Sequence, residues 1–217
     1  MPGKLRRRAF GLVLALCGAV ALGGCRESEF HSIDVAGSSP ALAFAMTRAG
    51  DDRAVTEADY RGKIVLLYFG YTFCPDVCPT TLTNIADILR KLGPEAQNVR
   101  VLFVSVDPDR DTLSVLADYA QNFGPHIDAL RGTPDELAAL ARRYRVVYSV
   151  TPATQDHPYE VTHSSVVYVF DGTGAARLLI PSLSSTKPDI DGATADLKRL
   201  IEAAHPPDLL TKLENLV

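Results

Sequence analysis

The stretch Gly62-Lys-Ile-Val-Leu-Leu-Tyr-Phe-Gly-Tyr-Thr-Phe-Cys74-Pro-Asp-Val-Cys78-Pro-Thr-Thr-Leu82 decides the fold. Residues 63–70 form a continuous apolar run, which is typical of a strand buried on both faces of a sheet. After the two cysteines, apolar residues recur at helical spacing; they are Leu82, Ile85, Ile88, Leu89 and Leu92. The stretch therefore predicts a central strand, a cysteine-containing turn and a helix in direct succession.

Working outward, strands and helices alternate along the rest of the chain. The pattern predicts strands at 99–106, 127–130, 165–170 and 175–180, and helices at 113–123, 133–144 and 190–204. Thr133 and Glu136 form a capping box at the start of one helix, with a proline at its first position. The early elements imply parallel strands with crossover helices, and the hairpin near residue 172 adds an antiparallel edge. This order predicts an α/β, thioredoxin-like fold: a mixed sheet with flanking helices.

The first residues have the pattern of a targeting segment. A basic start, with Lys4 and three arginines, precedes an apolar run of 14 residues from Ala9 to Leu22. That run is short for a membrane-spanning helix, which needs roughly 20 residues, so it favours a secretory signal. Leu22-Gly-Gly-Cys25 resembles a bacterial lipobox, which predicts cleavage before Cys25 and lipid attachment to its sulfur. An ordinary signal peptide and an uncleaved anchor remain alternatives.

The expected organisation follows from this segment. We expect a signal peptide with lipobox at 1–24, a lipidated N-terminus and tether at 25–40, and one domain at 41–217. Removing residues 1–24 takes four positive charges from a chain of net charge −4, which leaves about −8. An acidic chain of pI near 5.7 argues against nucleic acid as a partner. It would also need lipid, rather than surface charge, to stay at an anionic membrane. The expected location is outside the cytoplasm, on the periplasmic side of a bacterial membrane.

The cysteine count singles out one dithiol. Of four cysteines, Cys17 lies in the apolar run and Cys25 at the lipid site, which leaves Cys74 and Cys78 for the domain. A thiol at a helix N-terminus has a lowered pKa, and thiolate is the form that binds metals or attacks disulfides. Three interpretations compete: a structural disulfide, thiol–disulfide exchange and metal binding. A loop this small gains little from a disulfide. Two thiolates favour copper(I), and a structural zinc site would need a second cysteine pair.

A two-sulfur site calls for a third ligand, and the residues alone do not choose it. The chain has five histidines: His31, His126, His157, His163 and His205. Four of them lie in the tether, a turn, a polar loop or the tail. His163 precedes the predicted strand 165–170, and in a thioredoxin-like sheet the entry loop of that strand lies across from the cysteine turn. A histidine at a strand start is more often structural or solvated than a ligand.

Three segments, in this order, resemble the Sco/SenC family over about residues 40–203. They are the stretch Gly62–Leu82, the acidic loop Ser105-Val-Asp-Pro-Asp-Arg-Asp-Thr112, and Thr162-His163-Ser164. The resemblance implies a thioredoxin-like copper chaperone that assists assembly of the binuclear copper A centre in cytochrome c oxidase subunit II. It implies Cys74, Cys78 and His163 as copper(I) ligands, with copper(II) binding left open. A separate thiol reductant would keep the dithiol reduced.

Two points stay open at this stage. In the acidic loop, Asp111 could cap the next helix while the rest is solvated, or Asp107 and Asp111 could orient the site or a partner. Asp76, between the cysteines, could be a weak ligand or interact with helix-end amides. The competing function is a thiol–disulfide oxidoreductase that reduces the cysteines of oxidase subunit II or another partner. Its C-x-x-x-C spacing differs from the C-x-x-C of thioredoxins. A peroxidase of related fold is a more distant reading.

Overall fold

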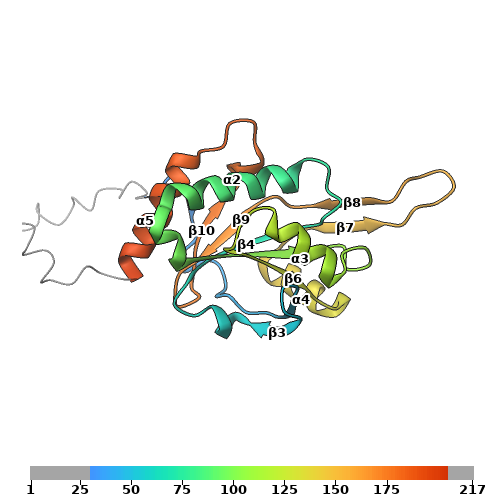
Figure 1. Ribbon diagram of the computed structural model, residues 1–217, viewed down its shortest axis with the longest axis horizontal. Coiled ribbons are helices and arrows are strands. Elements are labelled where there is room, and N and C mark those ends of the chain that lie inside the picture. The colour runs from blue at the N-terminus through green and yellow to red at the C-terminus, as the bar shows by residue number, and fades with distance from the viewer. Residues whose placement is uncertain (1–29, 205–217) are drawn as a thin grey trace, which may run out of the picture.

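The computed structural model describes residues 30–204, and its centre is an eight-stranded sheet (Figure 1). The strand order is β1-β10-β9-β4-β5-β6-β2-β3. These strands are β1 Ile33–Asp34, β2 Ala45–Arg48, β3 Arg53–Thr56, β4 Ile64–Gly70, β5 Val99–Ser105, β6 Ile127–Arg131, β9 Val167–Phe170 and β10 Ala176–Ile180. The helices are α2 Val77–Leu92, α3 Leu113–Gln121, α4 Pro134–Tyr144 and α5 Ile190–Ala204. Three short 3-10 turns complete these elements: η1 Glu57–Tyr60, η2 Gly93–Asn98 and η3 Ser182–Ser184.

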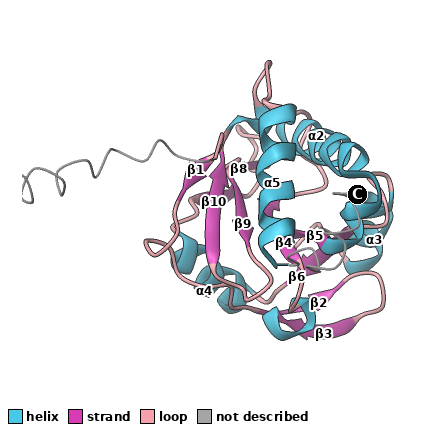
Figure 2. Cartoon of the chain, turned by 90° about the vertical axis from the view of Figure 1, so that its left-hand side faces the viewer, coloured by secondary structure: helices cyan, strands magenta, loops and turns pink. Residues whose placement is uncertain are grey.

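The apolar runs explain why β4 and β5 lie at the centre. Every residue of β4 is buried, and β4 pairs in parallel with β5 from Ile64↔Val99 to Gly70↔Ser105. On its other side β4 pairs antiparallel with β9. α2 and α5 pack against each other on one face of the sheet, and α4 covers the other (Figure 2). The predicted mixed sheet with flanking helices is confirmed.

Local signals account for the helix starts. Thr133 Oγ1 accepts a hydrogen bond from the Glu136 amide, and the Glu136 carboxylate accepts one from the Thr133 amide. This is the predicted capping box, and Pro134 occupies the first helical position. The start of α3 differs from the prediction. Its cap is Thr112, whose side chain accepts a hydrogen bond from Val115, so Asp111 does not cap this helix.

The N-terminal part of the described chain differs from the predicted tether. β1 pairs antiparallel with β10, so residues 33–34 belong to the sheet. The carboxylate of Asp196, on α5, accepts hydrogen bonds from the amides of His31 and Ser32 at 2.9 and 2.7 Å. Residues 31–35 are therefore held against the domain that was expected to begin at residue 41. The predicted signal peptide, Cys17, Cys25 and His205 lie outside the described residues.

Two hairpins were not predicted. The first, β2 and β3, joins the edge of the main sheet through β6. The second forms a separate two-stranded sheet from β7 Tyr148–Thr151 and β8 Glu160–His163, and it projects at one end of the molecule (Figure 1). His163 is the last residue of β8, whereas the sequence placed it before a strand beginning at residue 165. That strand, β9, begins at Val167.

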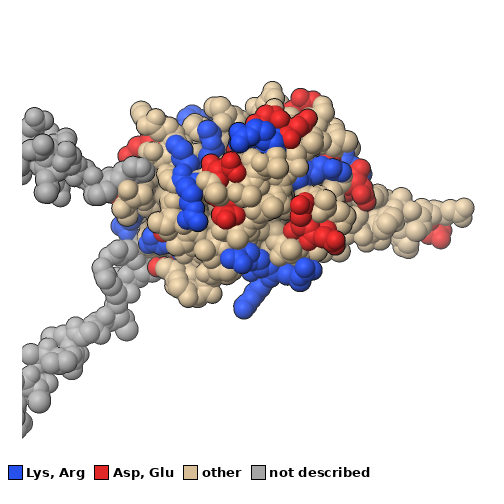
Figure 3. All heavy atoms as spheres, turned by 90° about the horizontal axis from the view of Figure 1, so that it is seen from below, with Lys and Arg blue, Asp and Glu red and all other residues tan. Residues whose placement is uncertain are grey.

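Charge is spread unevenly over this shape. Figure 3 shows basic and acidic side chains interspersed over the body, while the projecting hairpin carries little charge. Residues 148–163 contain no lysine or arginine, and their acidic residues are Asp156 and Glu160. Within residues 30–204, none of the helices combines the length and apolarity needed to cross a bilayer.

Candidate metal centre

The two cysteines lie where β4 ends and α2 begins. Cys78 is in the first turn of α2 and is fully buried, whereas Cys74, in the preceding loop, is partly exposed. The Cys78 amide donates a hydrogen bond to Cys74 Sγ at 3.4 Å. The positive end of the helix dipole and this amide both favour a thiolate at Cys74. The predicted position of the dithiol at a helix N-terminus is thus found in the structure.

Gly70 makes room for the buried sulfur. A Cβ atom at this position would lie 2.7 Å from Cys78 Sγ and 2.6 Å from Cε2 of Phe103. Both distances are far below van der Waals contact, so any side chain at residue 70 would displace the sulfur or the ring. The absence of a side chain at the end of β4 thus fixes how deeply Cys78 can lie.

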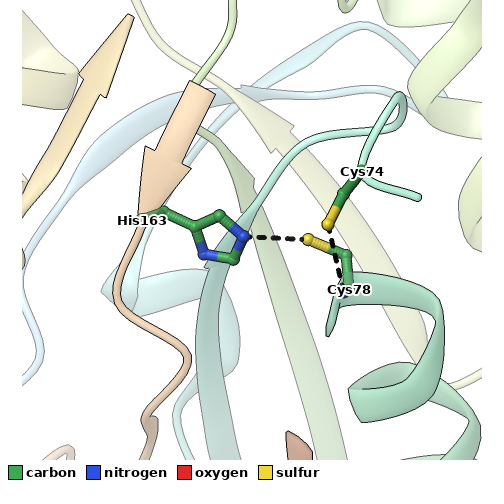
Figure 4. A group of neighbouring side chains, drawn as sticks. All are labelled: Cys74, Cys78 and His163. Carbon is green, nitrogen blue, oxygen red and sulfur yellow. Dashed lines mark hydrogen bonds between the residues drawn. The ribbon is translucent and has the colours of Figure 1, made fainter. Parts of the chain in front are cut away.

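His163 reaches the cysteines from the projecting hairpin. Its Nε2 atom lies 3.2 Å from Cys78 Sγ (Figure 4). The rings of Tyr71 and Tyr68 meet the imidazole edge-on, at centroid distances of 5.7 and 6.2 Å. Tyr71 also donates a hydrogen bond from its hydroxyl to the carbonyl of Val161, two residues earlier on β8. Residues from β4 and the cysteine loop therefore surround the imidazole and hold its strand.

The hydrogen bond of the other ring nitrogen leaves Nε2 available. His163 Nδ1 lies 3.0 Å from the carbonyl oxygen of Ser164. A carbonyl oxygen only accepts, so Nδ1 carries the proton and Nε2 of the neutral ring has a free lone pair. Metal-binding histidines commonly use this arrangement, because the outer hydrogen bond fixes the tautomer and the ring orientation. The imidazole is therefore prepared for a ligand at Nε2.

The three side chains form a compact set of potential metal ligands. Sγ of Cys74, Sγ of Cys78 and a ring nitrogen of His163 all lie within 4.8 Å of one another. One ion with bonds of about 2.0–2.3 Å, the lengths known for zinc, bridges atoms roughly 4–4.6 Å apart. The donor set is soft, with two sulfurs and one imidazole, and such a set selects copper(I) over hard cations.

The two thiols differ strongly in acidity. The hydrogen bond from the Cys78 thiol lowers the pKa of Cys74 to about 3 against the opposing effect of burial, and hydrogen bonds from the backbone amides of Cys78 and Asp76 add to the shift. The same pairing with Cys74, together with burial, raises the pKa of Cys78. The metal-free dithiol therefore carries one thiolate, at the more exposed sulfur. Binding a metal through both sulfurs releases the remaining proton from Cys78.

Two carboxylates of the acidic loop, Asp107 and Asp111, are buried and support the site. Asp111 is fully buried, and its carboxylate accepts hydrogen bonds from the amide and hydroxyl of Thr72 and from the hydroxyl of Ser105. Asp107 is 1% exposed; it accepts a hydrogen bond from the Tyr159 hydroxyl and forms an ion pair with Arg110. The prediction that Asp107 is solvated is wrong, whereas Asp109 is exposed. The two buried carboxylates connect the cysteine loop to the end of β5 and to the start of β8.

The sulfurs can be reached from a cavity at the surface. A cavity of about 330 Å³ opens next to them and is lined by Tyr71, Cys74, Val77, Val161, His163 and Ser184, among others. Because Cys74 and His163 both border this cavity, an incoming ligand group can approach the two more exposed members of the set without unfolding the chain. The third member, Cys78, lies behind them.

The remaining candidates lie outside this set. Asp76 accepts a hydrogen bond from the Thr80 hydroxyl at 3.3 Å and makes no side-chain cap on α2. His31, His126 and His157 belong to no other group of potential metal ligands among residues 30–204. Sequence reasoning missed Tyr71, Thr72 and Tyr159, which hold the loop and the hairpin. The sequence signal for Tyr71 and Thr72 is that they lie within three residues of Cys74.

Fold and site together define a thioredoxin-like α/β protein with a Cys₂His metal-binding group. A family model described as SCO1/SenC matches residues 40–202, and the chain belongs to this family.

Individual relatives agree with this assignment. The chain is 42% identical over 124 residues to the mitochondrial SCO2 homolog of Bos taurus, covering 56% of this chain and 47% of that protein. The copper-bound structure of Bradyrhizobium japonicum ScoI is 38% identical, with a TM-score of 0.66, covering 75% of this chain and 99% of the other. Copper-bound yeast Sco1 is 28% identical, also with a TM-score of 0.66, covering 80% and 94%. The chain spans about half the length of the curated relatives it matches.

Proposed function

We propose that this chain is a membrane-anchored copper(I) chaperone that delivers copper to the binuclear copper A centre of cytochrome c oxidase subunit II. The observation that carries the proposal is the compact Cys₂His set of Cys74, Cys78 and His163. Two related proteins were solved with copper bound. The Sco family is described as one of cytochrome c oxidase assembly proteins.

In this proposal the copper ion is cargo. Cys74 and Cys78 bind it as thiolates and His163 binds it through Nε2. Transfer proceeds by ligand exchange: a thiolate or imidazole of the partner enters through the cavity beside Cys74 and replaces one ligand at a time. Cys78, which is buried, is the last ligand that a partner can reach. Copper(II) binding is a further property that the same set could support.

Redox state controls this cargo. Oxidation of the metal-free dithiol, with a thiolate at Cys74 and a thiol at Cys78, forms one S–S bond and removes two electrons and one proton, which eliminates both sulfur ligands. A periplasmic thiol reductant must return those electrons before copper can bind again.

We place the chain outside the cytoplasm, on the periplasmic side of a bacterial membrane. There we propose removal of residues 1–24, lipid on Cys25 and a copper-binding domain in the remaining chain. Several curated relatives are described as mitochondrial, and one is a SCO2-like protein of the bacterium Rickettsia prowazekii.

An anaerobic copper(I) titration against a chromogenic chelator tests the proposal. The reduced mature chain should bind one copper(I) and outcompete the chelator. His163→Ala should weaken binding, and Cys74→Ser or Cys78→Ser should weaken it more, because a hydroxyl is a poor ligand for a soft ion. A reduced wild-type chain that fails to take copper(I) from the chelator refutes the chaperone.

The second candidate is a thiol–disulfide oxidoreductase, and the exposed Cys74 thiolate favours it. Cys74 would attack a partner disulfide and release one partner thiolate. Cys78 would then lose its proton, attack the mixed disulfide and release the second thiolate, leaving this chain oxidised by two electrons. An insulin-reduction assay with a thiol reductant separates the candidates, since sustained turnover would place the enzyme first.

A further inference from the structure

The hairpin that carries His163 is weakly connected to the rest of the fold. β7 and β8 pair only with each other and not with the eight-stranded sheet. An isolated two-stranded hairpin is at best marginally stable in water. A histidine at its end would therefore occupy many positions unless contacts with the body fix β8. Those contacts decide whether Nε2 of His163 stays beside the sulfurs.

One anchoring residue is Tyr159, immediately before β8. Its hydroxyl donates a hydrogen bond to Asp107 Oδ1 at 2.7 Å. Because Asp107 is almost fully buried, its carboxylate has little water to compete with this bond. Arg110 forms an ion pair with the other carboxylate oxygen of Asp107. The same carboxylate thus binds the hairpin and the guanidinium.

Arg110 joins the two halves of the site. Its Cζ atom lies 3.9 Å from the centroid of the Tyr159 ring. It also lies 4.8 Å from the ring of Phe73 and 5.8 Å from that of Tyr71, both in the loop that leads to Cys74. A guanidinium attracts aromatic faces at these distances, and its planar shape allows it to stack against more than one ring. The hairpin has no lysine or arginine of its own, so this cation comes from the acidic loop (Figure 3).

We propose that Arg110 positions His163 for copper binding. By stacking on Tyr159 and pairing with Asp107, Arg110 holds the start of β8 against the loop that carries Cys74. Its role is positional: it does not touch the metal. The expected effect on copper affinity rests on the proposed copper function. The contacts that hold His163 in place are those of the metal-free structure. If the hairpin opens more often, the observed affinity falls by the fraction of time that His163 is in place.

The test compares the copper(I) affinity of each variant in the wild-type chain and in a His163→Ala chain. Arg110→Gln should weaken binding about tenfold, and Tyr159→Phe about threefold, because it keeps the ring and removes one hydrogen bond. In a His163→Ala background each change should weaken binding by less than about twofold, since the group being positioned is gone. The matched control is Arg53→Gln. Arg53 lies on β3, away from the site, and also forms an ion pair with an aspartate, Asp59. The affinity of this control variant should equal that of the wild type.

A second measurement reads the geometry without copper. Hydrogen exchange of the β8 amides in the metal-free, reduced chain should quicken about tenfold in Arg110→Gln, while the amides of β2 and β3 stay unchanged. Tyr159→Phe, which leaves the buried ion pair intact, provides the same reading if Arg110→Gln does not fold. Unchanged exchange in β8, or an equal affinity loss with and without His163, overturns the proposal. If the wild-type chain does not bind copper(I), the proposed chaperone function is refuted. The positioning role of Arg110 is then tested by hydrogen exchange of the β8 amides alone.

Discussion

Thr72 and Asp111 are 39 residues apart in the chain, yet the Thr72 hydroxyl donates a hydrogen bond of 2.6 Å to Asp111 Oδ1. The Thr72 amide and the Ser105 hydroxyl bind the same carboxylate. This buried carboxylate therefore fixes the backbone two residues before Cys74. The end of β5, the acidic loop and the cysteine loop behave as one structural unit.

Truncating Asp111 should destabilise the fold and loosen the cysteine loop. Asp111→Ala leaves three buried donors without an acceptor, which should cost about 2–4 kcal/mol of unfolding free energy. Denaturant unfolding of the reduced, metal-free chain measures this loss. The control is Asp109→Ala, in the same loop, which should change stability by less than about 0.5 kcal/mol. Equal effects of the two substitutions would contradict the structural role of Asp111.

The same carboxylate predicts a pH dependence. Burial raises the pKa of Asp111 despite its hydrogen bonds, so the folded state binds a proton more readily than the unfolded state. The contribution of Asp111 to stability is therefore largest in acid and is lost as pH rises through its folded pKa. Asp111→Asn does not titrate there. The stability of wild type relative to Asp111→Asn should fall as the pH rises above about 4, the ordinary pKa of an aspartate, and a rise would refute the shift.

The two thiols should differ in reactivity. With a pKa of about 3, Cys74 remains a thiolate in weak acid, whereas Cys78 is buried and its pKa is raised. Alkylation by iodoacetamide should therefore modify Cys74 first, at a rate nearly constant from about pH 8 to pH 5. Cys78→Ala removes the main hydrogen-bond donor and should restore a pH-dependent rate. Peptide mapping by mass spectrometry assigns the modified residue. A wild-type rate that drops tenfold per pH unit would exclude the thiolate.

Adding one methyl group at Gly70 should disturb the metal site. Because the new Cβ would collide with Cys78 Sγ and the Phe103 ring, Gly70→Ala should cost about 1–3 kcal/mol of stability and weaken copper(I) binding. Gly50→Ala is the matched control, since its Cβ would meet no atom within 4 Å. Thermal unfolding and the chelator titration measure both effects. Normal copper affinity in a folded Gly70→Ala chain would show that Cys78 has more room than the structure gives it.

Releasing residues 30–35 from α5 should be detectable without any change in the copper affinity of the site. Asp196→Ala removes the acceptor for two backbone amides and should cost about 1–3 kcal/mol. Residues 30–35 should then become sensitive to limited proteolysis, while copper(I) affinity stays unchanged. Asp191→Ala, at an exposed position of the same helix, should leave the proteolysis pattern as in the wild type. Resistance of Asp196→Ala to cleavage would mean that β1 holds the segment without it.

Elements with long apolar signals were predictable from the sequence. β4 and β5 are buried along nearly their whole length, so their sequences read as continuous apolar runs. The hairpin strands β2, β3, β7 and β8 have four residues each and mixed exposure, so each is too short for its pattern to identify a strand. Their existence depends on pairing partners distant in the chain, and no local pattern encodes those partners.

The site divides in the same way. Cys74 and Cys78 were singled out by cysteine count and by position before a helix, both of which are local. His163 was implied by family resemblance, because a contact across 85 residues is a property of the folded chain. Asp107 and Asp111 occupy a loop that looks solvated in sequence, and their burial follows from the packing of Thr72, Ser105 and Tyr159 around them.

The hold of Asp196 on His31 and Ser32 limits how far the domain could travel from a membrane. If Cys25 carries lipid as we propose, five residue steps join it to Phe30, and even a fully extended chain of that length reaches at most about 18 Å. Phe30 lies at the α5 end of the molecule, while the hairpin projects from the opposite end (Figure 1). Such a short linker would keep the α5 end near the lipid headgroups, and the copper site would face away from the membrane. Under that proposal, copper would be presented about a domain's length from the bilayer.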